Sequence, residues 1–464
     1  MTILLPDLLY HDHAFRTGLA VAYDATSGRI DRVAKADSLG DAEVTRLPGR
    51  ALIPGFINCH SHSFQRVIRG RTQWKPAHAE ASDFWSWRLS MYQAVLSIEP
   101  DALYDVARFC FMEMLCAGYT TVGEFHYVQR NLAGGRYGDG NELAHRIIAA
   151  AESVGIRICL LNVCYATGAI DQPLWPEQRR FATPDVQQFL ADTDALVGSM
   201  NNRTLVSVGV APHSVRAVPR PWVREIHEYA SERGMPLHMH VSEQPAEVEE
   251  CVQVHGLRPG ALLANDGILD ARFTGIHGTH LDDAEIALFG AARASVCLCP
   301  TTERDLGDGL ARIAGMINAD VSLCIGTDSQ SVIDPLEELR LIEYNERLRL
   351  LRRVVAARGY GSTDRLETAP VLMAIGGTGG AKSLGIHAGA FETGMAADFA
   401  AINLEHDGMT GWDAETLGPL LTLSAPASVV SDVWVGGVQR VHNGRHADRE
   451  AVSDAFRRVA RLQK

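Results

Sequence analysis

Histidine and carboxylate side chains occur near the ends of several short apolar runs of this sequence, where they could bind a metal ion. His60 and His62 end the run ALIPGFINCHSH, and on an extended strand residues two apart point to the same face. Such a pair also arises by chance, but His240 in PLHMHVSE and Asp328 in VSLCIGTDSQ add two further donors. Three imidazoles and one carboxylate suit zinc with an open position for water, and iron and manganese accept similar donors. The spacing predicts one divalent metal ion, with Zn²⁺ as the first choice.

Other polar residues near this predicted metal site could move protons during a hydrolysis. A divalent metal lowers the pKa of its bound water to about 7 and so supplies hydroxide near neutral pH. Glu243 can carry a proton to the nitrogen of a substrate C=N bond, and Asp328 can accept one from the attacking water. His280 is expected to orient the hydroxide, with His277 as the competing residue. The predicted catalytic residues are therefore Glu243, His280 and Asp328.

Eight short runs rich in β-branched residues must position these side chains, and longer amphipathic segments separate the runs. This alternation, from about residue 50 to residue 390, indicates repeated βα units and a parallel sheet. Eight strands favour a closed (β/α)₈ barrel, in which catalytic groups come from the carboxyl ends of the strands, over an open doubly wound sheet. The runs are 51–62, 120–127, 157–165, 205–215, 236–243, 273–281, 295–301 and 321–330.

The two ends of the sequence have a different pattern from the middle. Residues 1–52 and 388–464 contain short strand-like runs with turn signals and no strong helical pattern. We expect these two segments to pair into one small β-sandwich domain. Residues 53–387 are expected to form the α/β catalytic domain, a TIM-like (β/α)₈ barrel.

Composition excludes several classes of protein. The 464 residues are 46% hydrophobic and 21% charged, as in an ordinary globular protein. A formal net charge of −13 disfavours a nucleic-acid or anionic-membrane binder, because the field of the protein repels polyanions. Nine cysteines without a Cys-x-x-Cys pair predict reduced thiols, and no apolar run has the length of a membrane helix. We therefore expect a cytoplasmic protein that acts on a small molecule.

The motifs around the predicted metal site resemble those of the amidohydrolase superfamily, and the resemblance covers nearly the whole chain. PGFINCHSH is similar to its first-strand motif, HMHVSE to its fifth, HGTHL to its sixth and GTDS to its eighth. Members with two metals usually bridge them with a carboxylated lysine on the fourth strand, but this sequence has no lysine between Lys75 and Lys382. The resemblance therefore implies the single-metal deaminase branch, in which ammonia leaves from a C=N or C–NH₂ group.

Within that branch the sequence resembles the formimidoylglutamate deiminase family, which converts N-formimino-L-glutamate to N-formyl-L-glutamate and ammonia in histidine degradation. The motifs that carry this resemblance are NCHSHSFQRVIRG, DFWSWRLSMY, GEFHYV and APHSVRAV. The resemblance implies a homodimer, and it implies substrate contacts by Gln65, Arg88, Tyr127, His213 and Arg216.

The chemistry of that substrate agrees with the two implied arginines. Formiminoglutamate has two carboxylates and a cationic formamidine, and a guanidinium binds a carboxylate through two parallel hydrogen bonds. The plainer interpretation is that Arg88 and Arg216 lie on the surface, as most arginines do. Two other functions remain open: a nucleobase, nucleoside or triazine deaminase, which needs a pocket for a flat ring, and an inactive scaffold, which would lack some of the metal ligands.

Overall fold

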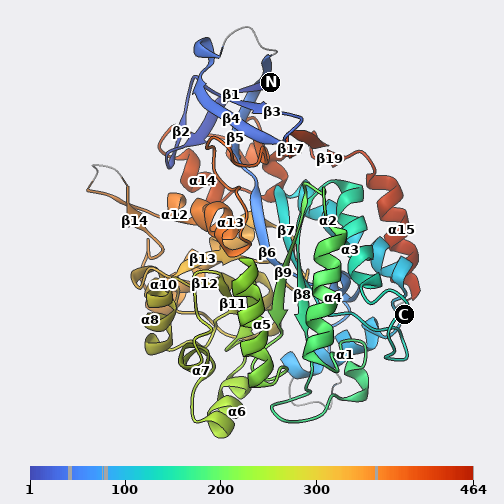
Figure 1. Cartoon of the computed structure of the whole chain (residues 1–464). Helices are drawn as coiled ribbons and strands as arrows, with labels where there is room; N and C mark the ends of the chain where they lie inside the picture. The colour runs from blue at the N-terminus through green and yellow to red at the C-terminus, as the bar shows by residue number, and fades with distance from the viewer. Residues whose placement is uncertain (40–43, 76, 78–81, 361–363, 463–464) are drawn as a thin grey trace.

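The computed structural model describes residues 1–39, 44–75, 77, 82–360 and 364–462 of the chain. Its central feature is a closed barrel of parallel strands in the order β10-β11-β12-β13-β6-β7-β8-β9 (Figure 1). Each strand coincides with one of the eight predicted runs, so the predicted barrel is confirmed. The strands are β6 (Phe56–Ser61), β7 (Tyr119–His126), β8 (Arg157–Cys164), β9 (Val206–Pro212), β10 (Leu237–Val241), β11 (Phe273–His277), β12 (Ser295–Leu298) and β13 (Ser322–Ile325).

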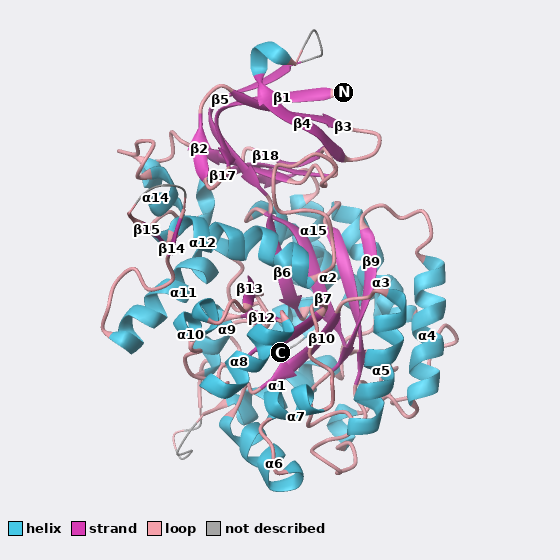
Figure 2. Cartoon of the chain, turned by 60° about the vertical axis from the view of Figure 1, so that its left-hand side comes forward, coloured by secondary structure: helices cyan, strands magenta, loops and turns pink. Residues whose placement is uncertain are grey.

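Helices connect the barrel strands and surround them (Figure 2). A representative helix is α3, in which Leu143, Ile147 and Val154 are buried on one face and Gly155 ends the helix in the left-handed region at φ 77°. The helices of this part are α1 (Phe84–Val95), α2 (Pro100–Cys116), α3 (Glu142–Val154), α4 (Val186–Ser199), α5 (Arg220–Arg233), α6 (Pro245–His255), α7 (Pro259–Asn265), α8 (Asp283–Ala292), α9 (Pro300–Leu306), α10 (Ile313–Asn318), α11 (Pro335–Leu350), α12 (Ala369–Ala374) and α13 (Gly380–Ser383).

A second sheet joins strands from both ends of the sequence, as predicted. Its nine strands are hydrogen-bonded in the order β19-β18-β17-β16-β5-β1-β3-β4, with β2 paired to β1. The long strand β5 leads directly into β6, so this sheet lies at one end of the barrel (Figure 1). The strands are β1 (Thr2–His11), β2 (Ala14–Arg16), β3 (Leu19–Asp24), β4 (Arg29–Lys35), β5 (Val44–Pro54), β16 (Phe399–Asn403), β17 (Val430–Val435), β18 (Val438–His442) and β19 (Arg445–His446). A separate hairpin pairs β14 (Arg358–Gly359) with β15 (Leu366–Glu367).

Two helices lie within the segment 388–464, for which we expected only strands and turns. The short helix α14 (Leu417–Leu423) follows β16, and α15 (Arg449–Leu462) follows β19. Residues Val452, Ala455 and Val459 of α15 are buried, and Phe456 stacks on Phe109 of α2 with ring centroids 4.1 Å apart. Helix α15 therefore packs against the barrel, because its apolar residues recur at helical spacing and cover α2.

Two expectations from composition were also tested. All nine cysteines have free thiols in the structure, as the spacing predicts. None of the described helices combines the length and the apolar character that a membrane span requires.

An ion pair connects barrel strand β8 with the segment that leads into β16. Arg157 donates from Nε and Nη2 to the two carboxylate oxygens of Asp398, at 2.8 and 3.1 Å. The backbone N–H of Gly436 donates to the same carboxylate at 2.7 Å. Because the side chain of Asp398 is only 2% exposed, its charge depends on these donors.

Replacing Arg157 with Met should destabilise the protein, because it leaves the buried Asp398 carboxylate without its cation. We expect a loss of about 3 kcal/mol in the free energy of unfolding, measured from urea transitions followed by tryptophan fluorescence. Arg312→Met is the matched control, since Arg312 pairs with an Asp283 side chain that is 84% exposed, and it should change stability by less than about 1 kcal/mol. Equal losses in the two variants would contradict this prediction.

Candidate active site

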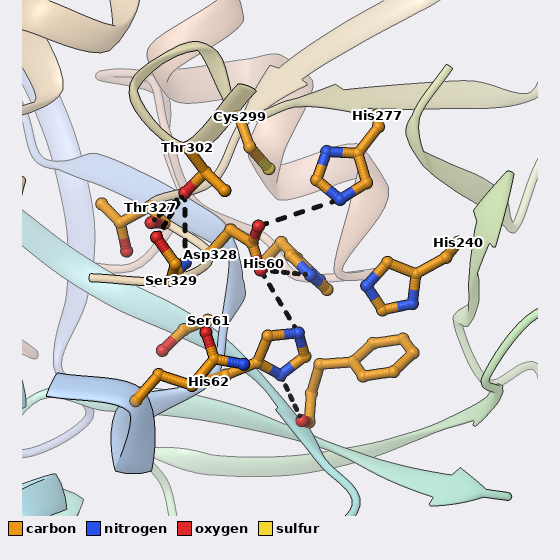
Figure 3. Close-up of polar contacts among 12 residues, drawn as sticks. His60, Ser61, His62, His240, His277, Cys299, Thr302, Thr327, Asp328 and Ser329 are labelled. Carbon is orange, nitrogen blue, oxygen red and sulfur yellow. Dashed lines mark hydrogen bonds and ion pairs between the residues drawn. The ribbon is translucent and has the colours of Figure 1, made fainter. Parts of the chain in front are cut away.

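Backbone hydrogen bonds between the ends of β6 and β13 bring three predicted metal ligands together. The Asp328 N–H donates to the carbonyl of His60 at 2.9 Å, and the His62 N–H donates to the carbonyl of Asp328 at 3.0 Å. As a result, Asp328 Oδ1 lies 3.2 Å from His60 Nε2 and 3.3 Å from His62 Nε2 (Figure 3). One donor atom from each of these residues and from His240 lies within 4.8 Å of the others. The four predicted ligands form one buried metal-binding group.

The imidazoles of this group are oriented as metal ligands. His62 Nδ1 lies 3.0 Å from the Phe125 carbonyl oxygen, and His240 Nδ1 lies 3.1 Å from the His213 carbonyl oxygen. Because a carbonyl only accepts, each Nδ1 carries the hydrogen and each Nε2 keeps a free lone pair. Neither ring nitrogen of the buried His60 has a hydrogen bond. Unpaired buried nitrogens beside a carboxylate fit a divalent cation.

The protonation states of the group also suit a metal. Burial lowers the pKa of His60 to about 3 and lowers the pKa of His62 and of His240, so these rings are neutral. Burial alone would raise the pKa of Asp328, but the adjacent histidines hold that pKa well below its ordinary value. Neutral imidazoles and an ionised carboxylate are the forms that bind a metal ion.

The backbone at the ends of β11 and β13 adopts an unusual conformation. His277 has φ 68° and Asp328 has φ 46°, which places both non-glycine residues in the left-handed region. Such a conformation costs about 1–3 kcal/mol per residue and persists only where the surrounding contacts enforce it. The barrel therefore maintains local strain at the two positions that face each other across the site.

His277, the residue that competes with His280 in the sequence analysis, lies beside two of the predicted catalytic carboxyl groups. His277 Nε2 lies 3.8 Å from Asp328 Oδ2 (Figure 3). It also lies 3.6 Å from Glu243 Oε1. His280 Nε2 instead lies 2.8 Å from the carbonyl oxygen of Asp308. The reason is that β11 ends at His277, which leaves His280 on the loop that follows.

Glu243 lies beside the metal-binding group without being one of its four donors, as expected. Burial raises the pKa of its carboxyl group to about 7, and the charge of His277 opposes this rise while that of Asp328 adds to it. The backbone N–H of Glu243 donates to the side chain of Glu247 at 3.2 Å, which fixes the loop after β10. A carboxyl group with this pKa can both donate and accept a proton near neutral pH.

A cavity adjoins the metal-binding group and contains the other predicted site residues. Predicted residues that line it are His62, Gln65, Arg88, Tyr127, His213, Arg216, His240, Glu243 and Asp328. Aromatic and apolar side chains complete the wall, namely Phe84, Trp87, Met91, Tyr92, Tyr165, Phe181 and Leu306. The cavity thus combines a metal-binding end with a wall of aromatic and apolar side chains, which is typical of a small-molecule site.

The two arginines in this cavity are buried, and neither forms an ion pair with a described residue. Arg88 and Arg216 are 5% and 6% exposed, and among the described residues no carboxylate lies within ion-pair distance of either. Nε and Nη1 of Arg88 and Nη1 of Arg216 also lack hydrogen-bond partners. The Arg88 guanidinium lies 4.5 Å from the ring centroid of Trp85 and 4.9 Å from that of Trp175. Because an unpaired buried charge is costly, these groups are suited to an anionic ligand.

At least one buried acceptor in the cavity is also unused. Gln65 Nε2 donates to the Tyr127 hydroxyl at 3.0 Å, while the buried Gln65 Oε1 has no partner. An amide oxygen accepts hydrogen bonds from cationic N–H groups. The cavity therefore offers donors for an anion and an acceptor for a cation.

Sequence reasoning missed Tyr165 of the cavity wall, although its position carried a signal. Tyr165 directly follows β8, at the barrel end where the other polar residues lie. Tyr92 lies four residues after Arg88 and therefore on the same face of α1. Trp175 lies on a long loop, where the sequence contains no comparable pattern.

Comparisons with known proteins agree with this architecture. Residues 51–440 match the model of the amidohydrolase family. The chain is 34% identical to the formimidoylglutamate deiminase of Pseudomonas aeruginosa, with 89% of each chain covered. It is 27% identical to a 5-methylthioadenosine/S-adenosylhomocysteine deaminase of Thermodesulfovibrio yellowstonii, with 85% of this chain and 81% of that protein covered. The crystal structure of an amidohydrolase from Brucella melitensis is 30% identical and superimposes over 100% of both chains with a TM-score of 0.90.

Replacing His240 with Ala should abolish metal binding, because it removes one of four convergent donors. We expect the metal content after dialysis, measured by plasma mass spectrometry, to fall from about one ion per chain to below about 0.2. His280→Ala should retain its metal, since His280 lies outside the group. A fully loaded His240→Ala protein would contradict the proposed ligand set.

Asparagine substitutions should distinguish His277 from His280. His277→Asn should lower kcat by about 10²–10⁴-fold, because it removes the imidazole that faces Glu243 and Asp328. His280→Asn should cause a much smaller loss. Steady-state ammonia release at matched metal content measures both effects. A larger loss of kcat in His280→Asn than in His277→Asn would favour His280 as the catalytic residue.

Proposed function

Because this chain belongs to the amidohydrolase family, we propose that it hydrolyses N-formimino-L-glutamate to N-formyl-L-glutamate and ammonia, a deimination in histidine degradation. The observation that carries this proposal is the pair of buried, unpaired arginines in the cavity beside the metal-binding group. The substrate has two carboxylates, and each can bind one guanidinium. The activity of the relative with 34% identity supports the same choice.

We propose that His60, His62, His240 and Asp328 hold one Zn²⁺ ion per chain. The donor set of three imidazoles and one carboxylate supports zinc. Such an ion, when bound, lowers the pKa of its water and supplies hydroxide at neutral pH. We also propose the homodimer that is expected for this family.

The side chains around the metal-binding group are proposed to move the protons of the reaction. Water attacks the formimidoyl carbon while Asp328 accepts a proton at a carboxylate oxygen. Glu243 delivers a proton from Oε1 to the terminal nitrogen, and the bond between that nitrogen and the carbon breaks. As the formyl C=O forms, the hydroxyl proton returns to the Glu243 carboxylate, and ammonia leaves with the proton that Asp328 held, as ammonium. His277, with Nε2 between Glu243 and Asp328, holds these two carboxyl groups in position and offsets their charge.

The cavity residues are proposed to bind the two ends of the substrate. Arg88 and Arg216 would each pair with a carboxylate, and the unused Gln65 Oε1 would accept a hydrogen bond from the cationic formamidine. His213 and Tyr127 form the wall between these groups, with ring centroids 5.7 Å apart. The arrangement would hold the formimidoyl carbon near Glu243 while the acidic end lies among the arginines.

A nucleoside or nucleobase deaminase, or a triazine deaminase, is the second candidate. The aromatic wall of the cavity and the relative that acts on methylthioadenosine favour a flat, ring-containing substrate. An uncharged ring would leave both guanidinium groups without an ion-pair partner in a buried cavity, which is unfavourable. We therefore place this candidate second.

Ammonia release from a panel of substrates tests the proposal directly. The purified zinc-loaded protein is assayed with N-formimino-L-glutamate, S-adenosylhomocysteine, adenosine, guanine and cytosine at about 1 mM, near the upper end of common KM values. We expect the highest kcat/KM for N-formimino-L-glutamate. Absence of turnover with that compound, together with turnover of a nucleoside or base, would reject the proposal in favour of the second candidate.

Replacing Arg216 with Met should raise KM for N-formimino-L-glutamate with a smaller effect on kcat, because the substrate carboxylate loses its cation. The expected loss in kcat/KM corresponds to about 2–5 kcal/mol. The surface substitution Arg312→Met serves as the control for the loss of a positive charge. A lower unfolding temperature with unchanged KM would instead mean that Arg216 has only a structural role.

A further inference from the structure

A single buried glutamine forms hydrogen bonds with Tyr92, Tyr165 and the backbone of Trp175. These residues lie at the end of the cavity that contains Arg88 and Arg216, which we call its anion-binding end. Gln178 closes the short helical turn Pro176–Gln178 and is 0% exposed. Its Nε2 donates to the Tyr92 hydroxyl at 3.0 Å and to the Tyr165 hydroxyl at 2.9 Å. Its Oε1 accepts the backbone N–H of Trp175 at 2.9 Å. Gln178 itself does not line the cavity, but Tyr92 and Tyr165 do.

The hydrogen bond from Trp175 fixes the orientation of the Gln178 amide. A backbone N–H can only donate, so the amide atom that faces Trp175 must be the oxygen. The amide nitrogen, which can only donate, therefore faces both tyrosines. Each phenolic oxygen then accepts from Gln178, and its own hydrogen is left without an acceptor among the described residues.

The two tyrosines line the same cavity as the unpaired arginines. The Arg88 guanidinium lies 5.5 Å from the ring centroid of Tyr92 and is stacked on Trp175, which the Gln178 amide also fixes. Tyr165 and Arg216 line the same cavity. Guanidinium groups have no acceptor, so they cannot take up the phenolic hydrogens. All four groups are donors that require an acceptor from a ligand.

We infer that Gln178 is a positioning residue that makes Tyr92 and Tyr165 hydrogen-bond donors and thereby selects substrates with a carboxylate at this end of the cavity. A carboxylate has two oxygens and accepts about four hydrogen bonds, so each of the two substrate carboxylates has acceptors for one guanidinium group and one phenolic hydroxyl. A carboxamide of the same shape has an NH₂ group that would meet another donor, which is unfavourable. The inference rests on the proposed function only for the identity of the substrate that carries the carboxylate.

Two substitutions of Gln178 distinguish the effect of hydrogen-bond direction from the effect of side-chain packing. In Gln178→Leu the amide is lost and the hydroxyls are no longer oriented, so KM should rise about 10-fold or more while kcat changes by less than about threefold. Gln178→Glu keeps the shape of the side chain, but the new carboxylate accepts the hydroxyl hydrogens of Tyr92 and Tyr165. The lone pairs of the two phenolic oxygens then point toward the ligand. In this variant KM should rise by about 100-fold or more.

Binding of glutarate, a dicarboxylate that cannot react, is measured by calorimetry on the same proteins. We expect Kd to rise in parallel with KM, in the order wild type, Gln178→Leu, Gln178→Glu. Gln129→Leu is the matched control, because Gln129 also donates to buried acceptors, Asn162 Oδ1 and the Val163 carbonyl, but does not line this cavity. Its KM and Kd should stay within about twofold of wild type.

The outcomes distinguish this inference from the proposed function. Suppose that the Kd for glutarate rises in the expected order of the three proteins, but the wild-type protein does not hydrolyse N-formimino-L-glutamate. This result would overturn the proposed function and retain the inference. Wild-type turnover with KM and Kd unchanged in Gln178→Leu would overturn the inference alone. Recovery of wild-type Kd in Gln178→Glu would also overturn it, because shape rather than the donor direction would then set the affinity.

Discussion

The contact between the carboxylate of Asp328 and the imidazoles of His60 and His62 is the interaction on which the rest of the site depends. It exists because the backbone of Asp328 pairs with that of His60 and His62 where β13 closes the barrel against β6. A buried carboxylate requires compensating charge or hydrogen bonds, and the surrounding imidazoles are uncharged when burial lowers their pKa. A divalent cation satisfies both the carboxylate and the free nitrogens, which explains why the barrel tolerates such a polar group in its interior.

At the end of the cavity that contains Arg88 and Arg216, the buried charge is positive rather than negative. Arg88 and Arg216 concentrate positive charge in a protein whose formal net charge is −13. Aromatic rings stack on Arg88, so the guanidinium is held by its faces and its edges stay free to donate. Under the proposed function the cavity has a metal-binding end and an anion-binding end, and its substrate contains a hydrolysable group and an acidic group at a fixed separation.

Most of the barrel and of the metal-binding group could be predicted from the sequence, because both follow from periodic patterns. Strand ends of a parallel barrel meet on one face, so His60, His62, His240 and Asp328 could be grouped without coordinates. The choice between His277 and His280 required the last residue of β11, and strand ends are the least certain part of such a prediction. The proposed role of Gln178 could not be predicted, because it depends on contacts between loops, and loops have no periodic sequence pattern.

The pairing of β5 with β16 also has a consequence for the order in which the protein folds during translation. Residues 50–54 hydrogen-bond with residues 399–403, so one edge of β5 must wait until most of the barrel has been synthesised. Until then β5 presents an open edge that could pair with a neighbouring nascent chain. Completion of the small sheet is thus a late step of folding, because it pairs residues that are far apart in the sequence. Chaperones that shield the edge of β5 would therefore influence the yield of folded protein.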